Sequence, residues 1–539
     1  MTRLDAPCLD LPRDHPSDVS GRGDVGSQPG SRSPLAVAQP WHWRRLPLNH
    51  RTGQDIFAAL FIGDPVHPWE TGDWRAIATL LESPYPTHQF CDGAQQLSRY
   101  SICAGPPRQV NGRPRLWTPP LGNALAGLKD FYRSQQRGRD RLDEQPGLGD
   151  RSLPFQGGWL GWLGYDLAWE IESLPIQNAD PLPFPVMYWY EPDQFAVLDH
   201  QTQQLWLAVT DPQDLPTLEQ RLAKPSPPPV VPEPVDAQET LRMLLERDRL
   251  HFHSTQADYT AAVRQAKEYI RAGDIFQANL SLRFSTPAPS DSWSLYRTLQ
   301  AINPSPFASY WRSPWGDVVS CSPERLLSVI PADTAQGQTG HWQISSRPIA
   351  GTRPRGQTPQ ADQDFAEDLS TDPKERAEHA MLVDLERNDL GRVCTWGSVA
   401  VDEFFTIERY SHVMHLVSNV VGELDPQYDP IDAIRALFPG GTITGCPKVR
   451  CMEIIEALEP VRRSLFYGSF GYLDYRGQLD LNIAIRTLLV PADETGGRSQ
   501  IIGQVGAGIV ADSDPEREWY ESLTKAAAQL SAIWRQSQP

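Results

Sequence analysis

Two segments of the sequence carry pairs of glutamates at helical spacing. Glu375 and Glu378 are three positions apart, as are Glu518 and Glu521, so each pair shares one face of a helix. Two helices that each present two carboxylates can hold a hard divalent cation, and Mg²⁺ is the ion that this donor set favours. Lys525, one turn further on, could bind a substrate carboxylate nearby. The alternative is a pair of solvated helix faces with ordinary salt bridges.

Two glycine-rich stretches could bring backbone N–H groups close to a ligand. Residues 438–448 form a loop that runs into a helix opened by Pro447, where an anion could bind, although a tight structural turn is the alternative. It is not a P-loop, because Cys446 follows where lysine is needed. Residues 506–511 match a dinucleotide pattern, but no βαβ unit surrounds them. We expect their glycines to end a strand and to admit a ligand there.

Other polar residues stand beside strand-like runs. Arg486 follows the apolar run 481–485 and could bind a carboxylate through two parallel hydrogen bonds. Glu324, after Pro323, is either a buried acid or a surface residue. His415 lies near the start of a strand, where a lone histidine is more often structural than catalytic.

The elements that must position these residues mix helices and strands. Asp372-Pro373 predicts the start of a helix that runs to about Asp389, and Asp514-Pro515 predicts a last helix to about Trp534. Further helical and strand patterns occur at 259–271, ending at Gly273, and at 195–198, 205–209 and 275–284. The mixture predicts an α+β fold with large, mostly antiparallel sheets.

The chain of 539 residues divides at its proline-rich stretches. Residues 1–40 have the composition of a disordered tail. Residues 41–220 and 255–535 form an N-terminal and a C-terminal part, and the prolines between 225 and 234 predict a linker at 221–254.

Composition excludes several classes of protein. The net charge of −18 argues against nucleic acid as a partner, because phosphate binding needs a basic surface. The sequence has no apolar run long enough to span a membrane and no signal peptide. Its seven cysteines are scattered, which predicts reduced thiols and a cytoplasmic protein.

Taken together, these motifs resemble those of the chorismate-utilising enzymes, specifically the synthase subunit (component I) shared by anthranilate synthase and aminodeoxychorismate synthase. The resemblance covers about 41–535 and is most specific over 258–525, where the family's motif segments occur in order. It implies a sandwich of two large antiparallel sheets flanked by helices, with the active site between them.

The resemblance also implies a role for each candidate residue. Glu378 and Glu521 correspond to Mg²⁺ ligands, with Glu375 and Glu518 beside them, and the ion binds the ring carboxylate of chorismate. Glu324 corresponds to the acid that protonates the departing hydroxyl. The remaining positions bind the substrate or line its ring: Arg486, Gly506 and Gly508 at the enolpyruvyl carboxylate, Gly351, Thr352 and Lys525 at the ring carboxylate, and His415 and Thr442 near the ring.

Within this resemblance, the residue at position 277, here Gln277, indicates whether the enzyme uses water or ammonia as the nucleophile. Family members that use water carry a lysine base at this position, so glutamine implies ammonia. The sequence has no glutaminase domain, and ammonia must therefore come from a separate glutamine amidotransferase subunit (component II).

Two sets of residues favour different positions of amination on the ring. Asn279, residues 322–325, 440–445 and 467–469, and Phe466 in place of a tyrosine resemble aminodeoxychorismate synthase, which serves folate biosynthesis by making the precursor of para-aminobenzoate. Ala350 and residues 412–422 resemble anthranilate synthase, which serves tryptophan biosynthesis. The first reading is favoured, anthranilate synthase is the alternative, and a non-catalytic chorismate-binding subunit is the second alternative.

Two further segments resemble the tryptophan-binding residues of the family. Residues 80–83, which end at Ser83, and residues 303–307, which contain Pro306 and Phe307, form a feedback site, a structural tryptophan site or a plain core contact.

Overall fold

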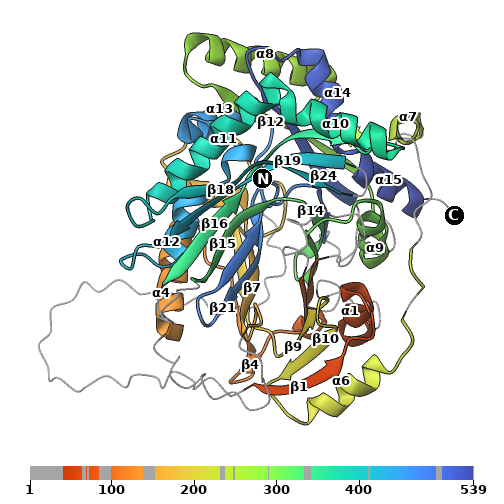
Figure 1. Cartoon of the computed structure of the whole chain (residues 1–539). Coiled ribbons are helices and arrows are strands. Elements are labelled where there is room, and N and C mark those ends of the chain that lie inside the picture. Colours follow the sequence, from red (N-terminus) through yellow and green to blue (C-terminus); the bar gives the residue numbers. More distant parts are fainter. Residues whose placement is uncertain are drawn as a thin grey trace, which may run out of the picture.

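The computed structural model of the chain describes residues 41–63, 68, 72–83, 99–136, 152–226, 228–230, 237–246, 249–288, 291–332, 341–410, 413–492 and 500–537 (Figure 1). The predicted tail 1–40 and part of the predicted linker lie outside these residues. Two large sheets and the helices around them make up the fold, so the predicted α+β class is confirmed.

The larger sheet has twelve strands among the described residues, and its neighbouring strands run antiparallel. Strands from the N-terminal part of the sequence form one side of this sheet and strands from the C-terminal part form the other, and the two sides join where β2 pairs with β13. Its order is β1 (His42–Pro47), β10 (Gln204–Val209), β9 (Gln194–Asp199), β3 (Tyr100–Ala104), β2 (Ala78–Glu82), β13 (Phe307–Ser313), β14 (Gly316–Ser322), β23 (Thr487–Pro491), β24 (Gln500–Ile509), β12 (Gln277–Pro287) and β11 (His251–Phe252), with β20 (Gly445–Cys446) also on β12.

The second sheet has ten strands in the described chain, again antiparallel. Its order is β17 (Ile349–Pro354), β19 (Val413–Glu423), β16 (Trp342–Arg347), β15 (Arg325–Pro331), β22 (Leu479–Asn482), β21 (Ser469–Asp474), β7 (Gly158–Leu163), β8 (Met187–Tyr190) and β6 (Leu116–Trp117), with β18 (Ala400–Arg409) on β19. A small hairpin joins β4 (Gln109–Val110) to β5 (Arg113–Pro114).

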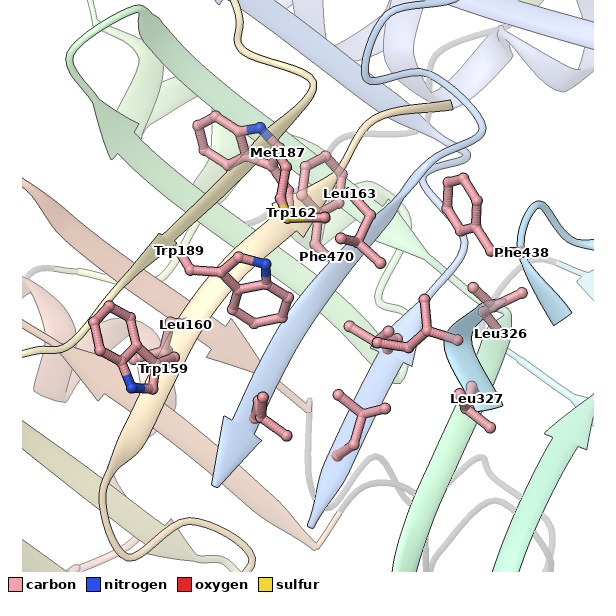
Figure 2. Packing of buried hydrophobic residues seen from close by; sticks show 14 of the residues in the cluster. Trp159, Leu160, Trp162, Leu163, Met187, Trp189, Leu326, Leu327, Phe438 and Phe470 are labelled. Atoms are coloured by element: carbon pink, nitrogen blue, oxygen red, sulfur yellow. The ribbon is translucent and has the colours of Figure 1, made fainter. Parts of the chain in front are cut away.

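The two sheets pack face to face through large aromatic side chains. Trp162 of β7 meets Trp311 of β13 with ring centroids 5.9 Å apart, and Trp311 meets Phe470 of β21 at the same distance. The hydroxyl of Tyr190 on β8 donates to Thr79 on β2 at 2.9 Å. Figure 2 shows the β7 and β8 side of this core, where Trp159, Leu160, Trp162, Met187 and Trp189 gather. Burial of so much aromatic surface holds the sandwich together.

Helices cover the outside of the sheets. Thr255 caps α8 (Gln256–Ala272), which ends at Gly273 with φ 81°. The others are α1 (Gly53–Phe61), α4 (Ala124–Gln136), α5 (Ala168–Ile171), α6 (Asp214–Leu222), α7 (Ala237–Glu246), α9 (Ser292–Ile302), α10 (Pro359–Thr371), α11 (Pro373–Gly391), α12 (Pro430–Leu437), α13 (Lys448–Leu458), α14 (Pro515–Lys525) and α15 (Ala527–Gln536), with 3₁₀ turns η1 (Trp74–Ala76), η3 (Tyr165–Leu167) and η4 (Gly441–Ile443).

Two details differ from the sequence patterns. The single last helix is wrong: the chain bends at the buried Ala526 between α14 and α15. The stretch 221–254 contains helix α7, which packs against α15. Among the described residues, no helix is long and apolar enough to cross a membrane.

Candidate active site

Helix α11 places two of the predicted glutamates beside β12. Asp372 caps the helix by accepting hydrogen bonds from the N–H groups of Lys374 and Glu375, at 2.8 and 3.2 Å. The carboxylate of Glu378 then accepts a hydrogen bond from the Nε2 of Gln277, at 2.9 Å. Burial raises the pKa of Glu378, and the like charge of Glu375 raises it further. The structure therefore joins the predicted metal ligand to the predicted nucleophile-selecting residue.

Gly508 is necessary for this contact. A Cβ atom at this position of β24 would lie 2.4 Å from Nε2 of Gln277 and 3.3 Å from Oε1 of Glu378. Gly508 and Gly506 lie among the last four residues of β24, paired with Asn279 and Ser281 of β12, so their expected place at the end of a strand is confirmed. They let the side chains of β12 lie flat against the neighbouring strand.

Glu375 is paired with an arginine that the sequence patterns did not single out. Arg353 of β17 donates to Glu375 at 3.1 Å and also binds Asp368 and Asp372. Gly351 has φ 82°, and a Cβ there would lie 2.8 Å from the Glu375 carboxylate. Position 351 therefore requires glycine both for its conformation and for the approach of Glu375.

Helix α14 brings the second pair of glutamates to the same place. Lys525 binds Glu521 at 3.0 Å, whereas the Oε2 atom of Glu518 is buried and has no hydrogen-bond partner in the described chain. Burial raises the pKa of Glu518, while Lys374 and Lys525 lower it. The same two lysines lower the pKa of Glu378. The faces of α11 and α14 therefore share one electrostatic environment.

The four glutamates are not drawn together into a preformed cluster. In the part of the chain that the structure describes, no three His, Cys, Asp or Glu side chains lie close enough to hold a metal ion. Two of the four carboxylates form ion pairs instead, Glu375 with Arg353 and Glu521 with Lys525. Mg²⁺ binding stays a prediction.

Glu324 is a buried acid, which decides between its two sequence interpretations. Burial raises its pKa to about 8, against the opposing effects of the Thr442 hydroxyl and the Ile349 N–H, and the charge of Glu386 raises it further. Glu386 of α11 was not singled out from the sequence. Burial and the charge of Asp389 raise its own pKa to about 7. Glu324 is therefore protonated at neutral pH and can act as an acid.

His415 and Arg486 lie deeper in the site. The Nδ1 of His415 forms a hydrogen bond with the hydroxyl of Thr352, at 2.9 Å. Burial and the nearby guanidinium of Arg486 lower the pKa of His415 to about 3, so its ring is neutral. Burial also lowers the pKa of Arg486, whose backbone has φ 52°. Among the described residues, no carboxylate forms an ion pair with Arg486, so its charge is available to an anion.

Gly506 marks two further polar residues. A Cβ atom at Gly506 would lie 2.8 Å from Oδ1 of Asn279 and 2.9 Å from the hydroxyl of Tyr467. Neither oxygen has a hydrogen-bond partner in the described chain. The alternation of side chains along β12 could have indicated Asn279 from the sequence, because residues 277 and 279 of one strand share a face. No local pattern signals Tyr467, whose backbone has φ 65°.

The structure also shows where Ala350 and the two predicted tryptophan-binding segments lie. Ala350 is buried in β17, opposite Leu416 of β19. The Ser83 hydroxyl donates to the Pro306 carbonyl at 2.7 Å, and the Arg325 guanidinium lies 5.1 Å from the centroid of the Phe307 ring. The structure thus brings these segments together, and tryptophan binding there stays a prediction.

A small acid suits this arrangement. Arg486 offers a half-buried positive charge that no carboxylate of the described chain pairs, and Glu324 offers a proton. Such a site, between antiparallel sheets and glutamate-bearing helices, defines an enzyme that acts on a small anionic metabolite.

Comparison with known proteins then identifies the family. Residues 78–531 match the model of the chorismate binding enzymes, and the chain belongs to that family. It is 53% identical over 517 residues to a Synechocystis sp. protein named "Anthranilate synthase component I-like protein", covering 94% of this chain and 95% of the relative. It is 45% identical to aminodeoxychorismate synthase component 1 of Bacillus subtilis, covering 70% and 77%. Anthranilate synthase component 1 of the same Synechocystis is 44% identical, with the same coverage.

Solved structures agree on the architecture. Anthranilate synthase component I from Streptococcus pneumoniae superposes with a TM-score of 0.63 at 30% identity, covering 80% of this chain and 92% of that chain. The menaquinone-specific isochorismate synthase from Escherichia coli superposes with a TM-score of 0.61 at 16% identity, covering 92% and 95%, which shows the shared fold alone. The chain is therefore a chorismate-utilising enzyme of the component I type.

Proposed function

We propose that this protein aminates chorismate at C4, as an aminodeoxychorismate synthase component I, with ammonia from a separate glutamine amidotransferase subunit. The observation that carries amination is the position of Gln277. Its amide donates to Glu378, beside Gly508, where it can orient a nucleophile but cannot deprotonate one. Water needs a base to become an effective nucleophile, whereas ammonia does not. The site is therefore suited to ammonia.

The residues divide the chemistry among them. Arg486 binds a carboxylate of chorismate, and backbone N–H groups around Gly506 and Gly508 assist it. Ammonia forms a bond to C4, and the ammonium group that results returns one proton to the carboxylate that Glu324 becomes. The ring C4–O bond breaks, and the hydroxyl takes the proton of Glu324 and leaves as water. Neutral His415 adds no charge that would compete for the substrate.

A magnesium ion fits the glutamates of α11 and α14. The unpartnered, buried Oε2 of Glu518 is a hard oxygen donor of the kind that Mg²⁺ prefers. Glu378 and Glu521 would hold the ion, with Glu375 and Glu518 beside them. The bound ion supplies electron withdrawal from the ring carboxylate.

Relatives of both branches are similar to this chain, at 45% and 44% identity, and the pair of Synechocystis proteins is the observation among them that favours C4. Synechocystis has one protein named anthranilate synthase component 1 and a second, different one to which this chain is more similar over nearly the whole length. A chain that resembles the second protein more strongly is expected to do a different reaction from the first. Because Ala350 offers no nucleophile, ammonia would attack C4 directly.

Anthranilate synthesis is the alternative, and one observation favours it. Ala350 is buried in β17, and its methyl side chain cannot act as a nucleophile toward the ring. Ammonia would then attack C2, and pyruvate would leave in the same site.

Product analysis tests the proposal. The protein is incubated with chorismate, Mg²⁺ and ammonium, with and without an aminodeoxychorismate lyase. We expect 4-aminobenzoate only when lyase is present, because amination at C4 leaves the enolpyruvyl group attached. Anthranilate without lyase would overturn the C4 assignment, and unchanged chorismate would indicate a non-catalytic binding subunit.

A further inference from the structure

Two glycines of β24 face three polar side chains, each of which has a side-chain oxygen with no partner in the described chain. Gln277 and Asn279 alternate along β12 and therefore project from the same face of the sheet. The Oε1 of Gln277, the Oδ1 of Asn279 and the hydroxyl of Tyr467 are all buried without a hydrogen bond in the described chain. Buried polar atoms of this kind are rare in folded proteins, and a group of three calls for a ligand.

The three side chains can approach β24 because Gly506 and Gly508 have no side chains of their own. Asn279 Oδ1 and the Tyr467 hydroxyl lie 2.8 and 2.9 Å from the point where a Cβ of Gly506 would stand. Gln277 lies two residues before Asn279 on β12, and its side-chain amide lies against Gly508. Its Nε2 is committed to Glu378, which leaves its Oε1 as an acceptor.

Tyr467 is held in place by residues outside this group. Its ring lies 4.6 Å from the guanidinium of Arg463, which is bound by Glu459 at 2.7 and 2.9 Å and by the carbonyl of Asn279 at 2.7 Å. The nearby Ser281 hydroxyl already donates to Glu459 and accepts from Gln504. Tyr467 also adopts a left-handed backbone, which non-glycine residues keep only where the surroundings enforce it.

We propose that Gln277, Asn279 and Tyr467 hold the attacking ammonia, an inference that rests on the proposed amination. Ammonia has three N–H donors and one lone pair. Three acceptor oxygens can bind the donors and leave the lone pair free to attack. The carboxylates of chorismate are acceptors themselves, so the amide oxygens of Gln277 and Asn279 do not bind them. The group is thus selective for a small hydrogen-bond donor and not for the dianion.

Tyr467→Phe tests this inference because it removes one oxygen and nothing else. Steady-state rates are measured with ammonium varied at saturating chorismate, and then with chorismate varied at saturating ammonium. Loss of one hydrogen bond should raise the KM for ammonium about three- to tenfold and leave the KM for chorismate unchanged. Asn279→Ala, a second variant, should also raise the KM for ammonium selectively, and it carries the test if Tyr467→Phe does not fold.

Tyr188→Phe is the matched control. Its hydroxyl is also buried without a partner, but it lies in the core against Trp162, with ring centroids 4.5 Å apart. This variant should change neither KM. An altered KM for chorismate, or wild-type values for both substrates, in a folded Tyr467 or Asn279 variant would overturn the ammonia site. Failure of the wild-type protein to consume chorismate with ammonium would instead overturn the proposed function.

Discussion

The site has a helix half and a sheet half, and the two halves differ in whether their charged and polar side chains have partners. In the helix half, two of the four carboxylates form ion pairs with cations of the same chain, Glu375 with Arg353 and Glu521 with Lys525, while burial raises the pKa of the other two. In the sheet half, burial leaves polar groups without partners or with an altered charge. The helix half comprises Glu375, Glu378, Glu518 and Glu521, and the sheet half comprises Gln277, Asn279, Glu324, Tyr467 and Arg486.

The difference shows how each half prepares for its ligand. An unpaired group buried in the sheet half cannot relax into water, so it is preorganised for a substrate and destabilises the protein without one. The ion pairs of the helix half are more exposed, and such pairs contribute little to stability. A divalent cation can therefore displace them at small cost. We expect substrate chemistry to depend on the sheet half and metal dependence on the helix half.

The largest effect is expected from Glu324→Gln in the sheet half. The amide cannot donate the proton that the leaving hydroxyl needs, so kcat should fall about 10²- to 10⁴-fold. The melting temperature should not fall, since Gln keeps the shape of a carboxyl that is already neutral. Glu453→Gln, on the surface of α13, is the control. A folded Glu324 variant with near wild-type kcat would remove this residue from the mechanism.

Glu521→Gln tests the helix half and should abolish most turnover while leaving the fold intact. Loss of one charged ligand weakens the metal site by several kcal/mol. Chelation of Mg²⁺ should inactivate the wild-type protein reversibly, and the variant should need more Mg²⁺ for its remaining activity. Glu516→Gln, an exposed change on the same helix, is the control. An unchanged Mg²⁺ requirement in the Glu521 variant contradicts the assignment.

Arg486→Met should separate binding from stability. The KM for chorismate is expected to rise at least tenfold, because a charge-assisted pair is lost. The melting temperature is expected to rise slightly, because a half-buried charge without an ion-pair partner is replaced by an apolar chain. Thermal unfolding and steady-state kinetics on the same preparation check both changes. A lower melting temperature with unchanged KM would show that Arg486 is structural.

The smallest effect is a pH dependence that originates in Glu324. Its pKa rises from 4.5 to about 8, so the proton-bound form is the stable one in the folded protein. The stability that this gives is fully present below pH 4.5 and is lost as pH rises through about 8. Wild-type kcat/KM should therefore decline above pH 8. Denaturant unfolding across this range should show a decline for the wild type that Glu324→Gln lacks, and identical profiles would contradict the shift.

Sequence patterns predicted the helix half better than the sheet half. Asp372-Pro373 and the spacing of Glu375 and Glu378 are local signals, and the structure confirms the helix they begin. No local signal predicts the break at Ala526, because alanine favours helices. Tertiary packing determines where α14 ends and α15 begins. Tyr467 escaped notice for a related reason: its role depends on a left-handed backbone and on Arg463, neither of which a short segment encodes.

Isotope labelling tests the central claim, amination at C4, most directly. Uniformly ¹³C-labelled chorismate is incubated with the protein, Mg²⁺ and ¹⁵N-ammonium without lyase, and the product is examined by NMR. The account predicts a one-bond ¹⁵N–¹³C coupling at C4, with the enolpyruvyl carbons still attached to the ring. Coupling at C2 together with free labelled pyruvate would contradict it.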